Sequence, residues 1–403
     1  MYRRILEQGI KDGILHLHLP GGESHTFGDR GREATWVIKR RGTLARLVLN
    51  PAFQLGETYM NGDWEADEGR LHDLLHILRT NIREKPPTRL LVPLLLLQQQ
   101  WNNVAASISN ASRHYNLDHT LFRLFLDRDM HYSCAYFTDE NADLEEAQQA
   151  KCRHIAGKLM LEPGQRVLDI GCGWGSLAFH LAQQHDVEVV GITLAREQLE
   201  YAQWRAQTLG VRNVRFELAD YREHREKYDR IVSVGMFEHV GKIYYSRYFR
   251  ELKRLLKASG VALIHSIGRS GPPVLTNPWI RRYIFPGGAI PSLSEMAGAT
   301  ETARLIITDV EVLRLHYAYT LRAWYDRFQR HRQEIAARLG ERFCRMWEFY
   351  LAISEVSFSG SDLVVFQQQV ATEHGLVPVS RNYLYADHTA SAAQWPREGA
   401  GVG

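Results

Sequence analysis

The amino-acid sequence predicts an α/β fold, in which a mostly parallel sheet is covered by helices on both faces, preceded by a small α+β domain. Three observations support this. After Gly164, apolar strand-like segments alternate with helical ones. A glycine-rich loop follows the first of these strands. The first hundred residues instead hold short strand-like pieces between glycine-rich turns. A chain of 403 residues is long enough for two domains.

We place the α+β domain at 1–100, with strands at 14–19 and 44–49 and a helix at 70–78. The second domain, 101–388, begins with a helical stretch that lasts to Gly164. Seven strands are then predicted, at 166–170, 187–192, 214–219, 229–234, 260–266, 306–315 and 363–369. The predicted helices are 177–184, 195–209 and one long helix from about 320 to 358. We expect the tail, 389–403, to be disordered.

The composition excludes several classes of protein. A net charge of +3 lacks the basic excess typical of nucleic-acid binders, so we expect no nucleic-acid partner. The four cysteines are not spaced as zinc ligands, so no metal is predicted. No apolar run approaches the roughly 20 residues that a spanning helix needs, and the first residues lack the apolar core of a secretory signal. We therefore expect a cytoplasmic protein.

The loop from Asp169 to Ser176 reads D-I-G-C-G-W-G-S and opens the helix after the first strand. Glycines such as Gly171 and Gly173 let the backbone approach a ligand without a Cβ clash. Phosphate-binding loops occupy the same position. The acid Asp169 at the strand end suits a cationic or hydroxyl-bearing ligand better. The structural alternative is a glycine turn in an unrelated α/β protein.

Polar residues also follow the next two strands. Thr193, with Gln198 a turn later, can hold ribose hydroxyls, cap the following helix, or do both. Asp220 can accept a hydrogen bond from an adenine amino group, and Tyr221 can stack on the ring. A plain loop turn is the alternative at Asp220 and Tyr221.

Ionisable residues end the fourth and fifth strands. Glu238 and His239 follow the fourth, and His265 lies at the end of the fifth. Parallel sheets bind ligands at the carboxyl ends of their strands. Three such groups at one edge favour a functional site over isolated structural roles. Aromatic segments at 130–137 and 316–324 carry polar groups beside their rings, which suits a partly polar pocket.

Seven segments occur in the order YSCAYF, LDIGCGWGS, GITLAREQ, MFEHVG, HSIGR, PWIRRYIFPGGAIPS and HYAYTLRAW. Together they resemble the cyclopropane fatty acid synthases, and the mycolic acid cyclopropane synthases in particular, over 115–385. The segment LGETYMNGDW at 55–64 resembles the extra domain of the bacterial phospholipid-acting members. The resemblance implies a Rossmann-like class I methyltransferase fold with a seven-stranded sheet.

The family's reaction is implied as well. A methyl group passes from S-adenosylmethionine to a cis double bond in an acyl chain of an intact phospholipid. The resulting carbocation loses a proton from the new methyl group, which closes the cyclopropane ring and leaves S-adenosylhomocysteine. Such a cation is stabilised by aromatic faces and must be shielded from water.

The resemblance assigns residues to both halves of this site. The catalytic residues would cradle a bicarbonate that acts as the base: Cys134, Glu238, His265, Ile267 (through its backbone) and Tyr317. The cofactor-binding residues, with the loop acid included, would be Tyr132, Ser133, Asp169, Gly171, Gly173, Thr193, Leu194, Gln198, Asp220 and Tyr221. Some relatives carry a Trp in the place of Tyr221.

A phospholipid substrate requires contact with a membrane, and we expect peripheral docking on its inner face. Two basic surfaces are candidates. Segment 322–345 holds seven Arg and three acids, and segment 279–285 places Arg281 and Arg282 among aromatic residues. Ordinary solvated surface is the alternative for both. The resemblance also implies a homodimer, and the N-terminal domain is a candidate for lipid binding or for dimerisation.

Other functions remain open at this point. The chain could methylate a lipid alkene without closing a ring, or methylate a small-molecule amine. It could also be a non-catalytic lipid-binding protein that kept the fold, or a coenzyme-bound dehydrogenase. The presence of Glu238, His265 and Tyr317 favours an enzyme that forms cyclopropane rings.

Overall fold

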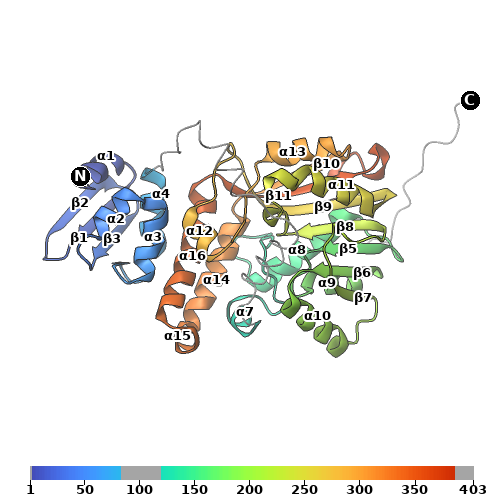
Figure 1. Cartoon of the computed structure of the whole chain (residues 1–403), viewed down its shortest axis with the longest axis horizontal. Coiled ribbons are helices and arrows are strands. Elements are labelled where there is room, and N and C mark those ends of the chain that lie inside the picture. Colours follow the sequence, from blue (N-terminus) through green and yellow to red (C-terminus); the bar gives the residue numbers. More distant parts are fainter. Residues whose placement is uncertain (1, 83–118, 386–403) are drawn as a thin grey trace, which may run out of the picture.

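The computed structural model of the chain describes residues 2–82 and 119–385 (Figure 1). The expected domain boundary near residue 100, the start of the helical stretch at 101 and the tail at 389–403 lie outside these ranges. No helix in the described ranges is long and apolar enough to cross a membrane.

The N-terminal part forms a four-stranded sheet with helices packed on it. Its elements are α1 (Tyr2–Gly9), β1 (Gly13–His18), β2 (Ser24–Arg30), β3 (Glu33–Ile38), α2 (Thr43–Leu49), α3 (Pro51–Met60), β4 (Trp64–Ala66) and α4 (Leu71–Asn81). The strand order is β2-β1-β3-β4, with only β1 and β3 parallel. Leu15 and Leu17 alternate with more exposed neighbours on β1, which is why this segment forms a strand with one buried face.

The predicted strand at 44–49 is wrong, because this segment is the helix α2. A short apolar run does not distinguish strand from helix by periodicity. Tertiary contacts decide here: Thr43 and Leu47 are buried at helical spacing, and Arg46 on the same helix forms an ion pair with the buried Asp63.

The second part contains a seven-stranded sheet, as predicted. Its strands are β5 (Arg166–Ile170), β6 (Glu188–Thr193), β7 (Val214–Leu218), β8 (Tyr228–Val234), β9 (Leu256–Arg269), β10 (Ile306–Leu313) and β11 (Leu363–Ala371). The order is β10-β11-β9-β8-β5-β6-β7. Strands β5 to β9 are parallel, whereas β11 runs antiparallel to both of its neighbours. The sheet order therefore changes direction at β5, between β6 and β8.

Helices cover both faces of this sheet, which explains the nearly continuous apolar strands. One face packs against α8 (Leu144–Leu159), α9 (Ser176–His185) and α10 (Arg196–Leu209), and the other against α11 (Tyr245–Leu255) and α13 (Leu293–Thr302). Neighbouring residues on β5 show the alternation: Val167 belongs to the first core and Leu168 to the second.

The long helix predicted at 320–358 is divided in the structure into α14 (His316–Arg330), α15 (Arg332–Leu339) and α16 (Glu341–Gly360). Gly340 separates the last two with a φ of 86°, a conformation that a glycine adopts without Cβ strain. In Figure 1 these helices, with α12 (Pro278–Tyr283), lie between the N-terminal sheet and the seven-stranded sheet. Helix α7 (His119–Phe125) packs against α14.

The two parts meet where α3 packs against α12 and α16. Gly56 on α3 permits this close approach, because an added Cβ would lie 2.6 Å from the indole ring of Trp279 and 2.8 Å from Phe349. Arg345 of α16 donates hydrogen bonds to the carbonyl oxygens of Tyr59 and Trp64 at the same junction.

Substituting Gly56→Ala is expected to lower the melting temperature, since overpacking costs about 1–3 kcal/mol and exceeds the gain in helix propensity. Gly157→Ala on α8 is a matched control, because its Cβ would meet only the end of the Leu384 side chain at 3.6 Å. The control should leave the protein equally stable or more stable by up to about 1 kcal/mol. Thermal unfolding of both variants measures the difference, and equal melting temperatures would contradict the packing described here.

Candidate active site

A cavity opens at the carboxyl ends of β5, β6 and β8, on the edge of the sheet where the glycine-rich loop lies. All ten predicted cofactor-binding residues line it: Tyr132, Ser133, Asp169, Gly171, Gly173, Thr193, Leu194, Gln198, Asp220 and Tyr221. Residues that the sequence analysis did not assign line it too, among them His131, Lys151 and Arg222.

The loop after β5 depends on its glycines. Gly171 has a φ of 81° and Gly175 a φ of 83°, both in the left-handed region. An added Cβ would lie 2.9 Å from the side chain of Met236 at Gly171, and 2.6 Å from the ring of Phe216 at Gly175. Two independent constraints, the backbone angle and the close packing, therefore explain these glycines.

The Asp169 side chain lies in the cavity wall, and one of its carboxyl oxygens lacks a hydrogen-bond partner among the described residues. It is buried, and its Oδ2 accepts no hydrogen bond from any described residue. Burial raises the pKa of this carboxyl group to about 7, and the Lys151 ammonium opposes the rise. A buried carboxyl group with an unsatisfied oxygen can accept hydrogen bonds from a ligand, which matches the cationic or hydroxyl-bearing ligand that we expected.

Thr193 and Gln198 lie in contact after β6. The Thr193 hydroxyl donates to Oε1 of Gln198 at 3.1 Å and accepts from the backbone N–H of Ala195 at 3.2 Å. The N-cap of α10 is Ala195 itself, without a side-chain cap. Thr193 therefore organises the turn before the helix and is not its cap.

Asp220 and Tyr221 are engaged with a residue that the sequence analysis did not consider. Asp220 accepts hydrogen bonds from Nε and NH2 of Arg222, at 2.8 and 2.6 Å. The Arg222 guanidinium also lies over the Tyr221 ring, 5.6 Å from its centroid, and Tyr248 meets that ring edge-on. Arg222 thus balances the charge of Asp220 within the cavity wall. An adenine amino group would have to bond to carboxylate oxygens that already accept from Arg222.

Glu238, His265 and Ile267 come together at the ends of β8 and β9. Glu238 lies in the 3-10 turn η1 (Phe237–His239), and its Oε1 accepts the backbone N–H of Ile267 at 2.5 Å. Its Oε2 is buried and has no hydrogen-bond partner among the described residues. Burial raises the pKa of Glu238 to about 7, although the Ile267 N–H opposes this. Glu238 is therefore poised to exchange a proton near neutral pH.

His265, two residues before Ile267 on β9, is neutral. Its Nδ1 lies 3.1 Å from Nε2 of Gln367 on β11. Burial lowers the pKa of His265 to about 3. The Ile267 backbone, expected to contribute to the bicarbonate cradle, makes two hydrogen bonds here: its N–H donates to Glu238 and its carbonyl oxygen accepts from Ser266 at 2.9 Å.

Cys134 and Tyr317 lie on two other segments that are joined to each other. The Thr320 hydroxyl of α14 accepts the backbone N–H of Ala135 at 3.0 Å, which ties this helix to the residue after Cys134. Burial raises the pKa of the Cys134 thiol, so it stays protonated. The Tyr317 ring packs against Phe358 and Trp324, with centroids 4.8 and 5.9 Å apart.

The five predicted catalytic residues do not appear in the described wall of the cofactor cavity. The wall does include Met236 and His239, which flank Glu238. Burial lowers the pKa of His239 to about 4, so it is neutral there. Glu238 therefore lies next to the cavity, at the same edge of the sheet.

Comparison with known proteins now adds to this geometry. The family model for "Mycolic acid cyclopropane synthetase" matches residues 102–368. The chain belongs to this family. This membership confirms the enzyme class that we expected, an S-adenosylmethionine-dependent methyltransferase.

Relatives of this synthetase-family chain match it over most of its length. The cyclopropane-fatty-acyl-phospholipid synthase of Escherichia coli (strain K12) is 39% identical, over 82% of this chain and 86% of its own. A probable fatty acid methyltransferase of Pseudomonas putida is 33% identical, over 93% and 99%. The crystal structure of a mycolic acid cyclopropane synthase in complex with SAH and CTAB has a TM-score of 0.62 and 34% identity, over 66% and 98%.

The first basic segment expected to dock on a membrane is largely neutralised in this synthetase-family chain. Arginines of this segment form ion pairs with described residues: Arg322 with Glu355, Arg327 with Glu145, Arg332 with Glu341 and Glu348, Arg342 with Glu57, and Arg345 with Glu65. The net charge counted from the sequence included only the acids within the segment. The fold also brings Glu57, Glu65, Glu145 and Glu355 to these arginines, so the positive charge of 322–345 is smaller than that count indicates.

Aromatic residues of the second segment, 279–285, are engaged within the fold. Trp279 is buried against the N-terminal part, and the Tyr283 hydroxyl donates to Glu57 at 2.6 Å. The Arg282 guanidinium lies over the rings of Phe53 and Tyr283. These aromatic residues join α12 to α3, so they are not available to enter a membrane interface.

Lys151 could have been identified from the sequence of α8. It lies four residues after Ala147 and four before Ile155, both buried, so helical spacing puts a lysine on an apolar face. A buried lysine usually has a specific partner, and here its Nζ donates to Ser133 Oγ at 3.2 Å.

Proposed function

We propose that this chain transfers a methylene group from S-adenosylmethionine to the cis double bond of an unsaturated phospholipid acyl chain. The products would be a cyclopropane fatty acyl phospholipid and S-adenosylhomocysteine. The observation that carries this proposal is Glu238, a buried carboxyl group with an unsatisfied oxygen that lies beside the cofactor cavity. The relative from Escherichia coli, named for this activity, supports the substrate class.

The cavity residues fit the methyl donor, which would supply the transferred methyl group. Asp169 offers an unsatisfied oxygen to its amino group or hydroxyls, and Thr193 and Gln198 offer polar groups to the ribose. The glycine loop brings the backbone close to the ligand. The related structure solved with SAH supports this use of the fold.

Aromatic residues beside the cavity suit a reaction that develops positive charge on an alkyl chain. Tyr132 lines the cavity, and its ring centroid lies 5.2 Å from that of Trp324. The Trp324 centroid in turn lies 5.9 Å from that of Tyr317. A ring face stabilises a nearby cation by about 0.5–2 kcal/mol. Because these rings are largely buried, they would also exclude the water that converts a carbocation to an alcohol.

The Glu238 group fits an anion such as bicarbonate, which would supply the base that takes the proton lost in ring closure. Glu238, with its raised pKa, can donate a hydrogen bond from its protonated form, and His265 and Cys134 are neutral at pH 7. The Tyr317 hydroxyl would complete the cradle. Ile267 would act indirectly, because its N–H orients Glu238.

An acyl chain of an intact phospholipid lies in a bilayer, so this proposal includes peripheral contact with the inner face of the cytoplasmic membrane. It also includes the homodimer implied by the family resemblance. The N-terminal part remains the candidate for lipid binding or for dimerisation. We assign the membrane contact to neither basic segment, because arginines of 322–345 are paired with acids and the aromatic residues of 279–285 join α12 to α3.

The full chain, incubated with methyl-labelled S-adenosylmethionine and vesicles of unsaturated phospholipid, is expected to transfer label to the acyl chains. Vesicles of fully saturated phospholipid with the same headgroup are the matched control and should stay unlabelled. Label in the headgroup, or equal labelling of both vesicles, would contradict the proposal.

A second candidate is methylation of the alkene without ring closure. The relative from Pseudomonas putida, a probable fatty acid methyltransferase that matches 93% of this chain, favours keeping it. Both reactions would label the acyl chain, so the structure of the lipid product decides between them.

A further inference from the structure

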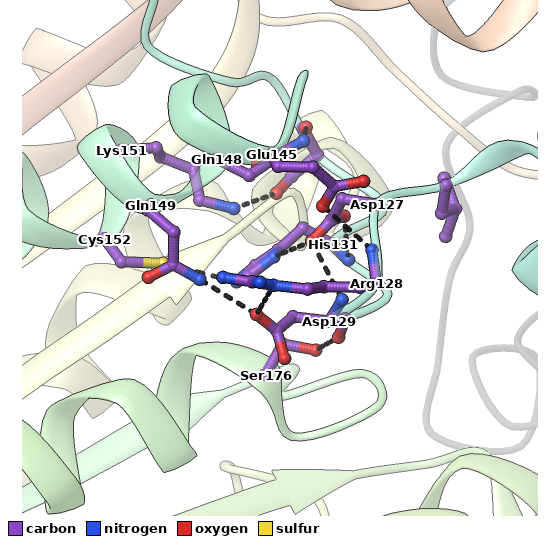
Figure 2. Close-up of polar contacts among 12 residues, drawn as sticks. Asp127, Arg128, Asp129, His131, Glu145, Gln148, Gln149, Lys151, Cys152 and Ser176 are labelled. Atoms are coloured by element: carbon purple, nitrogen blue, oxygen red, sulfur yellow. Dashed lines mark hydrogen bonds and ion pairs between the residues drawn. The ribbon is translucent and has the colours of Figure 1, made fainter. Parts of the chain in front are cut away.

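One face of α8 holds the wall of the cofactor cavity. Gln148, Lys151 and Cys152 lie at positions i, i+3 and i+4, so they share this face. Gln148 donates to the Ser133 carbonyl oxygen at 3.0 Å, and Lys151 donates to the Ser133 hydroxyl at 3.2 Å. The Sγ of Cys152 lies 3.2 Å from Nε2 of His131 (Figure 2). The helix therefore contacts the cavity wall on both sides of Tyr132.

The other ring nitrogen of His131 is held by a carboxylate. Nδ1 lies 2.8 Å from Oδ2 of Asp127, and the His131 backbone N–H donates to Oδ1 at 2.8 Å. Asp127, His131 and Cys152 are all buried. We call these three residues the buried array. In this array the imidazole of His131 contacts the Cys152 thiol through one ring nitrogen and the Asp127 carboxylate through the other.

The neighbouring charges shift the pKa values of His131 and Cys152 in the buried array. Burial and the Lys151 ammonium lower the pKa of His131, but Cys152 and Asp127 raise it to a net value of about 9. Burial raises the pKa of the Cys152 thiol, and the imidazolium and Lys151 bring it below its usual value. The contact between the Cys152 sulfur and the His131 ring is therefore favoured by charge as well as by geometry, since charge assistance strengthens a hydrogen bond.

Asp129, in the same segment, is held by α8 and by two further parts of the chain. Asp129 accepts hydrogen bonds from Gln149 at 2.8 Å and from Arg205 at 2.5 Å, and its carbonyl oxygen accepts from Ser176 of the glycine-rich loop. Met130 lies between these anchors with a φ of 67°, which is rare for a residue with a side chain. Such a conformation persists only where its surroundings hold it.

We propose that the buried array positions Tyr132 and Ser133 for the methyl donor, so that Cys152 and Asp127 are positioning residues for cofactor binding. This rests on the proposed function, which assigns the cavity to S-adenosylmethionine. Cys152 acts through His131, since His131 lines the cavity and the fully buried Cys152 does not belong to the described lining. A preformed wall lowers the entropic cost of binding.

Calorimetric titration of S-adenosylmethionine into Cys152→Ser and Asp127→Asn tests this role. Each should raise the Kd about tenfold, the order expected for a lost hydrogen bond to a charged group. Cys344→Ser is the matched control, since Cys344 is also a fully buried thiol but lies on α16, where its Sγ contacts the Arg332 carbonyl oxygen. Its Kd should equal that of the parent.

A spectroscopic signature separates this role from general destabilisation. As the pH is raised, the ultraviolet absorbance of a thiolate should appear for Cys152 before it appears for Cys344, because their pKa values are shifted in opposite directions. Cys152→Ser should lose this first transition and Cys344→Ser should keep it. Should Cys152→Ser fail to fold, Asp127→Asn and the absorbance of the parent decide.

A parent-like Kd in Cys152→Ser, equal rises in both serine variants, or a first thiolate transition that survives in Cys152→Ser would overturn the positioning role. A parent that does not bind S-adenosylmethionine would refute the assignment of the cavity and this role together. A parent that binds it tightly but leaves vesicle lipids unlabelled would refute only the proposed reaction.

Discussion

Replacing Glu238 with Gln is expected to lower kcat by about 10²–10⁴-fold, the range that a positioned acid or base contributes. The amide oxygen can still accept the Ile267 N–H, so the local fold should persist. An amide cannot exchange the proton that a carboxyl group with a pKa of about 7 exchanges near neutral pH. Because Glu238 does not belong to the described lining of the cofactor cavity, the Kd for S-adenosylmethionine should stay at the parent value.

Steady-state assays on phospholipid vesicles and calorimetric titration measure these two quantities separately. Glu348→Gln provides the control, because Glu348 is also a buried carboxylate but pairs with Arg332, at the junction of α15 and α16. The control should lose stability without losing kcat. If Glu238→Gln turned over normally, or lost cofactor binding instead of turnover, its assignment to the chemical step would be wrong.

Replacing Asp169 with Asn is expected to raise the Kd for S-adenosylmethionine by roughly 10–100-fold, since hydrogen bonds to a charged group are worth about 1.5–3 kcal/mol. The parent should also bind more weakly as the pH falls below about 7, the pKa of this buried carboxyl group. Below that pH the ligand must displace a proton, which weakens binding by up to about tenfold per pH unit. Titrations at several pH values should show this slope in the parent and not in Asp169→Asn.

Folding stability should depend on pH in the opposite direction to ligand binding. Burial raises the pKa of Asp169 from its usual 3.8 to about 7, so the folded state holds the proton more tightly than the unfolded state. This carboxyl group therefore lowers stability as the pH rises through that window. Without ligand, Asp169→Asn should melt at or above the temperature of the parent at pH 8. A variant that melted lower and still bound the ligand normally would show that Asp169 is structural.

The sequence predicted the sheet well where burial alone determines the element. The strand predicted at 166–170 has the bounds of β5, because its apolar residues face a core on both sides. The segments where prediction failed depend on contacts from distant parts of the chain. The apolar run at 44–49 became a helix beside Asp63, and the helix predicted at 320–358 is interrupted at Gly340.

That the predicted cofactor-binding residues would line one cavity was predictable for a similar reason. Thr193, Asp220 and the glycine loop all follow parallel strands, whose ends meet at one edge of the sheet. Arg222 and His131 were missed because their roles come from contacts: one pairs with Asp220, and the other is held by α8. The pairing of charges across the fold likewise lowers the net positive charge that the sequence indicated at 322–345.

The central claim is that the chain closes a cyclopropane ring on a phospholipid acyl chain. Proton nuclear magnetic resonance of lipids extracted after reaction with the purified chain tests it most directly, because ring protons resonate at unusually high field. We predict these signals, with loss of the olefinic signals in equal proportion, and neither change with Glu238→Gln. A branched or unsaturated methyl product without ring-proton signals would contradict the account.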